Sequence, residues 1–114
     1  MNCEHNLASY ARLSERFAKS GVLVIGVHTP ETGPEHVPAN VRRSVKAKGI
    51  KYPVLLDPEA DNWNRWRVRA WPTLFLVDKK GFIRYLWEGE LNFNDEEGES
   101  KMAKRVEALL KEKG

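Results

Sequence analysis

A proline directly before an apolar strand constrains the fold of this chain more than any other feature. Trp71-Pro72-Thr73 precedes the almost wholly apolar stretch Leu74–Asp78, and Lys79-Lys80-Gly81 then leads into a second strand-like stretch, residues 82–87. Proline cannot donate to a β-ladder, so Pro72 must lie at the first residue of a strand or on an edge. An X-Pro bond is the only kind that becomes cis at low cost, which makes this tight entry a candidate for one. The sequence therefore predicts a constrained strand entry followed by a β-hairpin.

Helix-like and strand-like segments alternate upstream of this point. Apolar residues at helical spacing predict a helix from about Cys3 to Lys19, which Ser20-Gly21 ends. Val22–Val27 is continuously apolar and β-branched, which is typical of a central or parallel strand covered on both faces. The next expected elements are a loop over residues 28–36, a helix from Pro38 to Gly49, a strand over residues 52–56 and a short helix with Asp57-Pro58 as N-cap and first residue, bearing Trp63 and Trp66.

The C-terminal part adds the hairpin, a polar loop over residues 92–98 and a last amphipathic helix marked by Met102, Val106, Leu109 and Leu110. The predicted order is therefore α-β-α-β-α-β-β-α. Strands alternating with helices, followed by a hairpin and a helix, are typical of an α/β fold with a mixed sheet and helices on both faces.

Length and composition limit the class of protein. A chain of 114 residues is long enough for one core, so we expect residues 1–114 to form a single domain. Hydrophobic residues at 41% and charged residues at 31% are ordinary for a soluble globular protein. A net charge of +3 with interleaved signs gives no reason to expect a nucleic-acid partner. As written, the chain has no signal peptide or membrane-spanning run, so a cytoplasmic location is the default expectation.

Several motifs, in order along essentially the whole chain, resemble the thioredoxin-like superfamily. They are Cys3 before the first helix, Val24–Glu31, Gly49–Val54, Trp71-Pro72-Thr73 and Asp78–Arg84. The most similar branch is the redoxin or TlpA-like one, which includes the thioredoxin-like domain attached to DsbD-type membrane proteins. The resemblance implies a three-layer α/β/α sandwich with a mixed sheet. It also implies a thiol–disulfide oxidoreductase that acts on protein thiols and disulfides without a cofactor, in a branch that is often extracytoplasmic.

Two parts of the family pattern are incomplete in this sequence. Family members carry Cys-x-x-Cys at the start of the first long helix, and Met1-Asn2-Cys3 aligns with the last three positions. Cys3 therefore takes the second, resolving position, and the nucleophilic cysteine is absent from the chain. The family's first central strand, directly upstream, is absent too. Its place is between Val22–Val27 and Leu74–Val77, so we expect the gap to be repaired, preferably by a homodimer that completes the sheet.

The resemblance also assigns the candidate site residues. Cys3 is the catalytic candidate, and Trp71, Pro72 and Thr73 form the loop that faces the thiols and pairs with an extended substrate. His28 and Glu31 follow a strand parallel to the missing one, so their loop should emerge at the same sheet end, and Glu31 could accept a proton from a buried thiol. Four of these residues have a simpler alternative: Cys3 as a remnant thiol, Pro72 as an ordinary strand-start proline, Trp71 as a core or rim aromatic, and Glu31 as a solvated loop carboxylate.

Cys3 limits what the chain can do alone, because it is the only cysteine. It could form a mixed disulfide but could not release its partner intramolecularly, so we expect the isolated chain to be inactive. One alternative function is a non-catalytic thioredoxin-like module that binds peptides through the proline loop. A weaker one is a peroxiredoxin-type antioxidant, which needs its peroxidatic cysteine in a proline- and threonine-rich loop before the first helix, and that loop is absent from the sequence. Cys3, His5, His28 and His36 match no zinc-ligand spacing, so no metal is expected.

Overall fold

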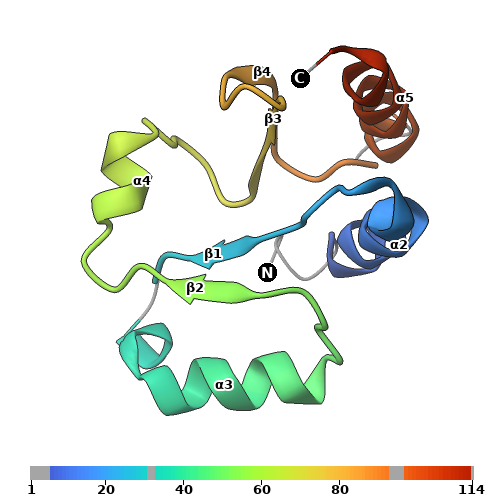
Figure 1. Cartoon of the computed structure of the whole chain (residues 1–114). Helices are drawn as coiled ribbons and strands as arrows, with labels where there is room; N and C mark the ends of the chain where they lie inside the picture. The colour runs from blue at the N-terminus through green and yellow to red at the C-terminus, as the bar shows by residue number, and fades with distance from the viewer. Residues whose placement is uncertain (1–5, 31–32, 93–96, 114) are drawn as a thin grey trace. The chain divides into compact units, whose positions relative to one another are not determined.

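The computed structural model of the chain describes residues 6–30, 33–92 and 97–113 (Figure 1). It confirms the predicted order of helices and strands. The elements are α2 (Leu7–Phe17), β1 (Gly26–His28), α3 (Pro38–Ala47), β2 (Val54–Leu56), α4 (Asp61–Arg65), β3 (Thr73–Val77), β4 (Ile83–Glu88) and α5 (Gly98–Lys111), with 3₁₀ helices η1 (Ala18–Ser20) and η2 (Gly33–His36). No helix among these residues is both long and apolar enough to cross a membrane.

The chain divides into two compact units. Residues 22–68 form the central unit, and residues 1–21 with 69–114 form the terminal unit. Each unit holds one pair of strands: β1 with β2 in the central unit, and β3 with β4 in the terminal unit. The first pair is parallel and the second antiparallel, so both kinds of pairing expected of a mixed sheet occur. That the two units make up a single domain stays a prediction.

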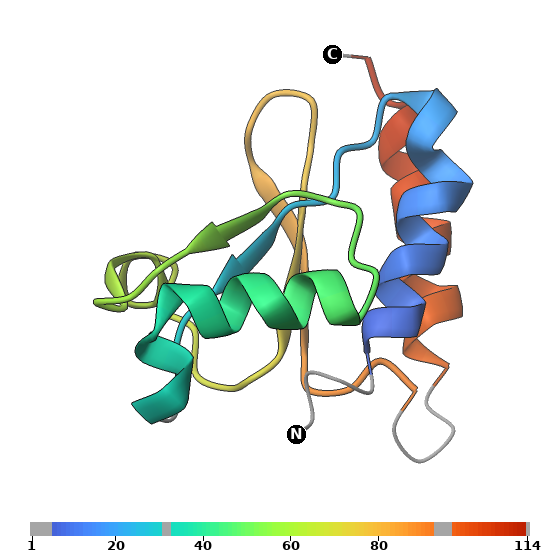
Figure 2. The same cartoon turned by 90° about the horizontal axis from the view of Figure 1, so that it is seen from below.

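The central unit is built on the parallel pair, in which Gly26, Val27 and His28 lie opposite Val54, Leu55 and Leu56. Backbone hydrogen bonds continue the ladder at both ends, from Gly26 N to Pro53 O at 2.8 Å and from Asp57 N to His28 O at 2.8 Å. The α3 helix lies beside the pair (Figures 1 and 2), and Val41 on this helix is buried. The unit therefore fixes the carboxyl ends of β1 and β2 next to each other.

Two predictions about the central unit are wrong in detail. The strand expected over Val22–Val27 is only Gly26–His28, and the side chains of Leu23, Ile25 and Val27 are 70%, 49% and 48% exposed. Burial alternates along this run, as on a strand covered on one face, and an all-apolar sequence cannot reveal which face lacks cover. The short helix begins at Asp61 and not at Pro58, because residues 57–60 form a turn closed by Ala60 N donating to Asp57 O.

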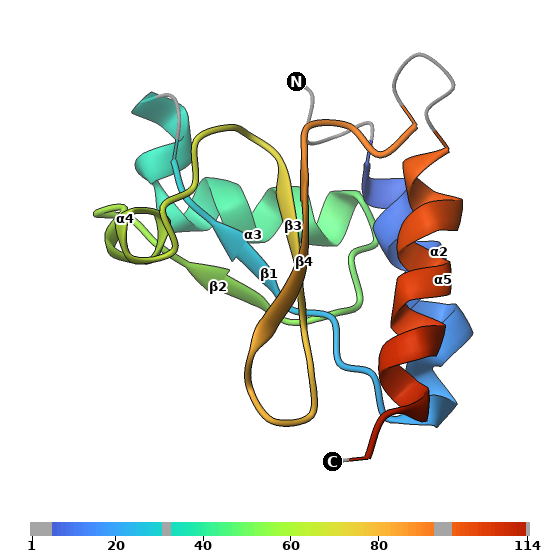
Figure 3. The ribbon, with the colours of Figure 1, turned by 90° about the horizontal axis from the view of Figure 1, so that it is seen from above.

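The terminal unit pairs the hairpin with two helices. In β3 and β4, Leu74 lies opposite Trp87 and Leu76 opposite Tyr85, with a bulge between Leu76 and Val77. The ring of Trp87 lies 5.9 Å from Lys101 Nζ and that of Tyr85 lies 4.8 Å from Arg105 Cζ, so α5 contacts this face of β4. Figures 2 and 3 show α2 and α5 side by side. The core of this unit consists of Leu13, Phe17, Leu91, Met102, Ala103, Val106 and Leu109.

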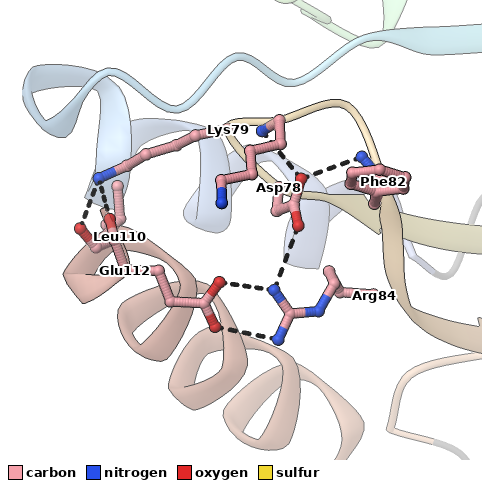
Figure 4. A network of polar contacts seen from close by, with 7 residues as sticks. Asp78, Lys79, Phe82, Arg84, Leu110 and Glu112 are labelled. Atoms are coloured by element: carbon pink, nitrogen blue, oxygen red, sulfur yellow. Dashed lines mark hydrogen bonds and ion pairs between the residues drawn. The ribbon is translucent and has the colours of Figure 1, made fainter. Parts of the chain in front are cut away.

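The hairpin turn is also bonded to the C-terminal end of α5 (Figure 4). Asp78 Oδ1 accepts from the N–H groups of Lys80 and Phe82, both at 2.9 Å, which closes the turn. Arg84 bridges Asp78 and both carboxylate oxygens of Glu112. Lys79 Nζ donates to Leu110 O at 2.9 Å and Glu112 O at 2.8 Å, which places a positive charge where helix carbonyls lack intrahelical partners. The network fixes the tip of the hairpin against α5.

Candidate functional site

The proline loop, residues Trp71 to Thr73, leads directly into β3. The Trp71–Pro72 peptide bond is cis, and Pro72 is buried while Trp71 and Thr73 are half-buried. Pro72 has no N–H, but its carbonyl accepts a hydrogen bond from Gly89 N at 2.8 Å, one residue beyond the end of β4. Thr73 Oγ1 donates to Ala70 O at 2.8 Å. The loop is therefore held from both sides of the proline, as the sequence analysis expected for a strand entry.

The segment that holds the proline loop, Gly89–Leu91, also contacts the start of α2. Asn6 precedes this helix and is 2% exposed. Its Oδ1 accepts from Leu91 N at 2.9 Å, and its Nδ2 donates to Tyr10 Oη at 2.9 Å and, in a longer contact, to Gly89 O at 3.4 Å. Asn6 was not predicted as a site residue. Asparagine is favoured at a helix start, which is the signal that could have found it, but the helix was expected to begin three residues earlier, at about Cys3.

Cys3 lies outside the described residues, so its predicted closeness to Pro72 stays a prediction. In the sequence it stands three residues before Asn6. The helix that follows it, α2, belongs to the same unit as the proline loop.

The other candidate residues belong to the central unit. His28 ends β1 and is half-buried, and its carbonyl accepts from Asp57 N at 2.8 Å. Glu31 lies outside the described residues, so its suggested role as a proton acceptor stays a prediction. His28 belongs to the central unit and the proline loop to the terminal unit, so it stays a prediction that the substrate-binding candidates form one site.

A buried carboxylate that the sequence analysis gave only a capping role lies beside His28. Asp57 is 5% exposed, and its Oδ2 accepts from Thr29 Oγ1 at 2.7 Å; Thr29 itself is 7% exposed. Asp57 Oδ1 and Oδ2 also accept from the N–H groups of Asn62 and Trp63, both at 3.0 Å. Asp57 therefore does cap the start of α4, although from four residues before its first residue.

These hydrogen bonds keep Asp57 charged. Burial would raise the pKa of this carboxyl, but the bonds from the Asn62 backbone, the Thr29 hydroxyl and the Trp63 and Asp61 backbones together lower its pKa below the ordinary value. With its oxygens occupied, Asp57 can fix the chain that follows β1 but has little capacity to move a proton. Within the residues that the structure describes, no group of three or more His, Cys, Asp or Glu side chains could hold a metal ion.

Solved structures define the class of the fold as thioredoxin-like. A protein described as a thiol:disulfide interchange protein DsbE, from Chlorobium tepidum, superposes with a TM-score of 0.82 over 96% of this chain and 71% of its own, at 16% identity. A thiol-disulfide isomerase from Corynebacterium glutamicum gives a TM-score of 0.83 over 98% of this chain and 74% of its own, at 24% identity. The fold class predicted from the sequence is confirmed.

The sequence places the chain within this class. The profile of the AhpC/TSA family matches residues 1–86, and the chain belongs to that family. It is 37% identical over 94 residues to protein DipZ of Mycobacterium tuberculosis and 32% identical over 91 residues to human NHL repeat-containing protein 2. It is also 26% identical over 93 residues to the thiol-disulfide oxidoreductase ResA of Geobacillus thermodenitrificans.

The relatives are longer than this chain. The matches cover 82%, 79% and 82% of the chain, but only 14% of DipZ, 12% of the human protein and 51% of ResA. The predicted resemblance to the redoxin and TlpA-like branch of the thioredoxin-like superfamily is confirmed.

Proposed function

We propose that this chain is the redox domain of a thiol–disulfide oxidoreductase of the TlpA-like kind, with Cys3 as its resolving cysteine. The observation that carries the proposal is the proline loop: Pro72 is buried at the entry to β3, and Gly89 holds its carbonyl, in a chain of the AhpC/TSA family. The α2 helix, before which Cys3 stands in the sequence, belongs to the same unit. The relative ResA is named a thiol-disulfide oxidoreductase, which supports thiols and disulfides as the substrates; we propose that these belong to proteins.

The proposed reaction needs two thiols. One thiolate attacks a sulfur of the substrate disulfide, forms a mixed disulfide and releases the other substrate sulfur as a thiolate. Cys3 then attacks the protein's sulfur in that mixed disulfide, so the substrate leaves with both sulfurs reduced and the protein keeps the new disulfide. Because these 114 residues contain one cysteine, the attacking cysteine is proposed to lie outside them, in the position before Met1.

A gain-of-function experiment tests this assignment. The chain as it stands should reduce insulin disulfides in dithiothreitol no faster than dithiothreitol alone. Extending it by one cysteine immediately before Met1 should produce an internal disulfide with Cys3 and a clear rise in insulin reduction. The same extension with serine is the control. Turnover by the unextended chain, or no disulfide in the extended one, would contradict the placement of Cys3.

The peptide-binding alternative makes a different prediction. If the domain only binds extended peptides through the proline loop, then Cys3→Ser should leave peptide affinity unchanged, and the added cysteine should bring no turnover. A peroxiredoxin-type antioxidant would be favoured only if the chain without the added cysteine consumed hydrogen peroxide with dithiothreitol as the reductant. The three functions are therefore separated by the same set of variants.

We also propose that two copies associate to complete the sheet. The support is that each described sheet has two strands and that Leu23, Ile25, Val27 and Leu55 in the central unit are 70%, 49%, 48% and 51% exposed. Sedimentation velocity should show a dimer at micromolar concentration, and Ile25→Lys should shift it towards the monomer. A monomer at every concentration would contradict this proposal.

A further inference from the structure

We propose that the outer side of α3 is a docking surface for an acidic peptide segment of a partner protein. The surface, which we call the basic face, consists of five cationic residues: Arg42, Arg43, Lys46, Lys48 and Lys51. The first three lie on α3, the fourth is its C-cap residue and the fifth follows the turn at Gly49. The inference concerns the central unit alone and does not depend on the proposed redox function.

Charge is strongly segregated in this part of the sequence. Residues 37–56 contain the five cations of the basic face and no aspartate or glutamate. The whole chain has a net charge of only +3, so the other residues together carry a net negative charge. Basic and acidic residues interleave over the chain as a whole, but not here. A local field of one sign attracts ligands of the opposite sign.

The structure presents the basic face to solvent, since all five of its residues are exposed. The α3 helix packs towards the β1–β2 pair with its other side, where Val41 is buried. Figures 1 and 2 show no described element of the central unit over the side of α3 that faces away from these strands. Because residues three and four apart lie on the same side of a helix, Arg42, Arg43 and Lys46 face outward together.

The α3 helix has no acidic residue that could neutralise these cations. No carboxylate lies three or four positions from any of the five, and Arg42 and Lys46, four positions apart, repel each other. Arg43 Nη2 donates to the neutral side-chain oxygen of Asn40. The helix dipole favours cations in the last turn, which accounts for Lys46 but not for Arg42 and Arg43 earlier in the helix. Stability of the helix therefore does not explain the basic face.

An extended peptide with a carboxylate at every second residue fits the spacing of the basic face. Arg42 and Lys46 lie about 6 Å apart along the helix axis, because each residue adds about 1.5 Å. Side chains on one face of an extended strand are two residues, or about 6.6 Å, apart. Arginine can also donate two parallel hydrogen bonds to a single carboxylate, which makes such a contact directional.

Two other anionic partners fit the basic face less well. The exposed apolar residues of α3 are Pro38, Ala39 and Ala47, whereas helices that bind a lipid surface bury bulky side chains such as tryptophan, phenylalanine or leucine in it. Proteins that bind single-stranded nucleic acids combine cations with aromatic side chains on which bases stack, and α3 has no aromatic residue. The chemistry of α3 therefore favours the acidic peptide.

Nuclear magnetic resonance on the whole isotope-labelled chain tests the docking surface. The probe is a synthetic peptide of alternating glutamate and serine that contains four glutamates and has blocked ends. It should shift the amide signals of residues 42–51 saturably and more than those of other residues. The affinity should fall when NaCl is raised to about 150 mM, because salt screens charge interactions. Shifts that are absent, independent of salt, or spread alike over the cations of both units would overturn the inference.

A pair of variants with equal net charge separates the basic face from a general effect of charge. Arg42→Gln with Lys46→Gln should raise the dissociation constant of the peptide at least fivefold. Lys104→Gln with Lys111→Gln, at two exposed positions of α5, should change it less than twofold. Equal losses in the two double variants would overturn the docking surface.

Two further variants guard against an effect on folding. Exchanging the two cations, as Arg42→Lys with Lys46→Arg, keeps their charge and should leave the affinity within twofold of the parent chain. If the double glutamine variant does not fold, Arg42→Gln alone should weaken binding in the same direction by a smaller factor. An unchanged affinity in a folded Arg42→Gln chain would contradict the role of this residue in the basic face.

Comparison probes test the choice of an acidic peptide as the occupant. They are a single-stranded DNA with the same number of charges as the peptide, and vesicles of phosphatidylcholine and phosphatidylserine in equal parts. At the same salt concentration the DNA should bind more weakly than the peptide, and the vesicles should not sediment the chain. Tighter binding of the DNA, or vesicle binding that is lost in Arg42→Gln with Lys46→Gln, would overturn this choice.

Discussion

Arg12 and Glu99 are joined by two hydrogen bonds, from Nε to Oε2 at 2.8 Å and from Nη2 to Oε1 at 2.5 Å. Arg12 lies on α2 and Glu99 in the first turn of α5, so the pair joins the two helices of the terminal unit. The guanidinium of Arg12, with smaller contributions from Ser9 and Asn92, lowers the pKa of Glu99 to about 2, although partial burial opposes the shift.

This shift makes part of the protein's stability dependent on acid pH. Because the pKa of Glu99 is lower in the folded state, its contribution is complete above the ordinary value of 4.5 and is lost as pH falls towards about 2. Urea midpoints measured from pH 7 to pH 2 should therefore decline less steeply in Glu99→Gln than in the parent chain. Glu107→Gln, which removes an exposed carboxylate paired with Arg16 between the same helices, is the control. Equal slopes for Glu99→Gln and the parent would refute the role of the pair.

Asp57→Asn should destabilise the central unit by about 1–3 kcal/mol, because a neutral amide cannot accept from Thr29 and two backbone N–H groups as a carboxylate does. The lowered pKa of Asp57 means that its contribution is present above the ordinary value of 3.8 and is lost as pH falls below it. Chemical denaturation and exchange of the Asn62 and Trp63 amides measure the effect. Asp61→Asn, an exposed change on α4, should have little effect on either measurement. A similar loss of stability in this variant would contradict the role assigned to Asp57.

Gly98→Ala should lower the free energy of unfolding by about 1–3 kcal/mol or more, because the added methyl group overpacks the site. A Cβ at this position would lie 2.1 Å from Leu91 O and 2.8 Å from the Trp87 ring, and the first of these is backbone that cannot rotate away. Thermal unfolding compares this variant with Gly33→Ala, where a Cβ would meet nothing within 4 Å. If the two substitutions lower the unfolding temperature equally, the close approach of α5 to Leu91 is contradicted.

Lys79→Met should weaken the contact between the hairpin turn and α5. The change keeps most of the side-chain length but removes the ammonium that bonds Leu110 O and Glu112 O, which is worth about 0.3–1 kcal/mol at a helix C-terminus. The loss should shrink at high salt, because charge interactions at the surface are screened. Lys80→Met, next to it on the same turn, provides the comparison in paired thermal unfolding curves.

The fold was largely predictable because its signals are local. Apolar spacing in α2 and α5, the proline before β3 and Lys79-Lys80-Gly81 between β3 and β4 each identify an element from a few neighbouring residues. The first strand was predicted too long, since continuous apolar sequence shows that Val22–Val27 suits a strand but not where its partner begins to pair. Pairing depends on residues far along the chain, such as Val54 opposite Gly26.

The contacts around the candidate site were less predictable. Trp71-Pro72-Thr73 was identified from its local pattern, whereas Asn6 was not singled out, because the helix was expected to begin three residues earlier, at about Cys3. Its role depends on Leu91 N, 85 positions away, and nothing in the local sequence indicates which distant donor a buried amide will meet. Asp57 was recognised as a helix cap, but its bond to Thr29 also joins the segments that follow two different strands and therefore required the structure.

The backbone of Gly89 limits how this position can vary in evolution. Its φ is +91°, and a Cβ there would meet nothing within 4 Å, so the constraint is the dihedral angle and not space. Since L-residues rarely adopt this conformation, a library randomised at position 89 and selected for folded protein should return mostly glycine, with asparagine as the main survivor besides it. A position with room for a Cβ would then tolerate almost no residue that has one, which makes Gly89 a sequence marker for chains that can build the same link to a proline loop.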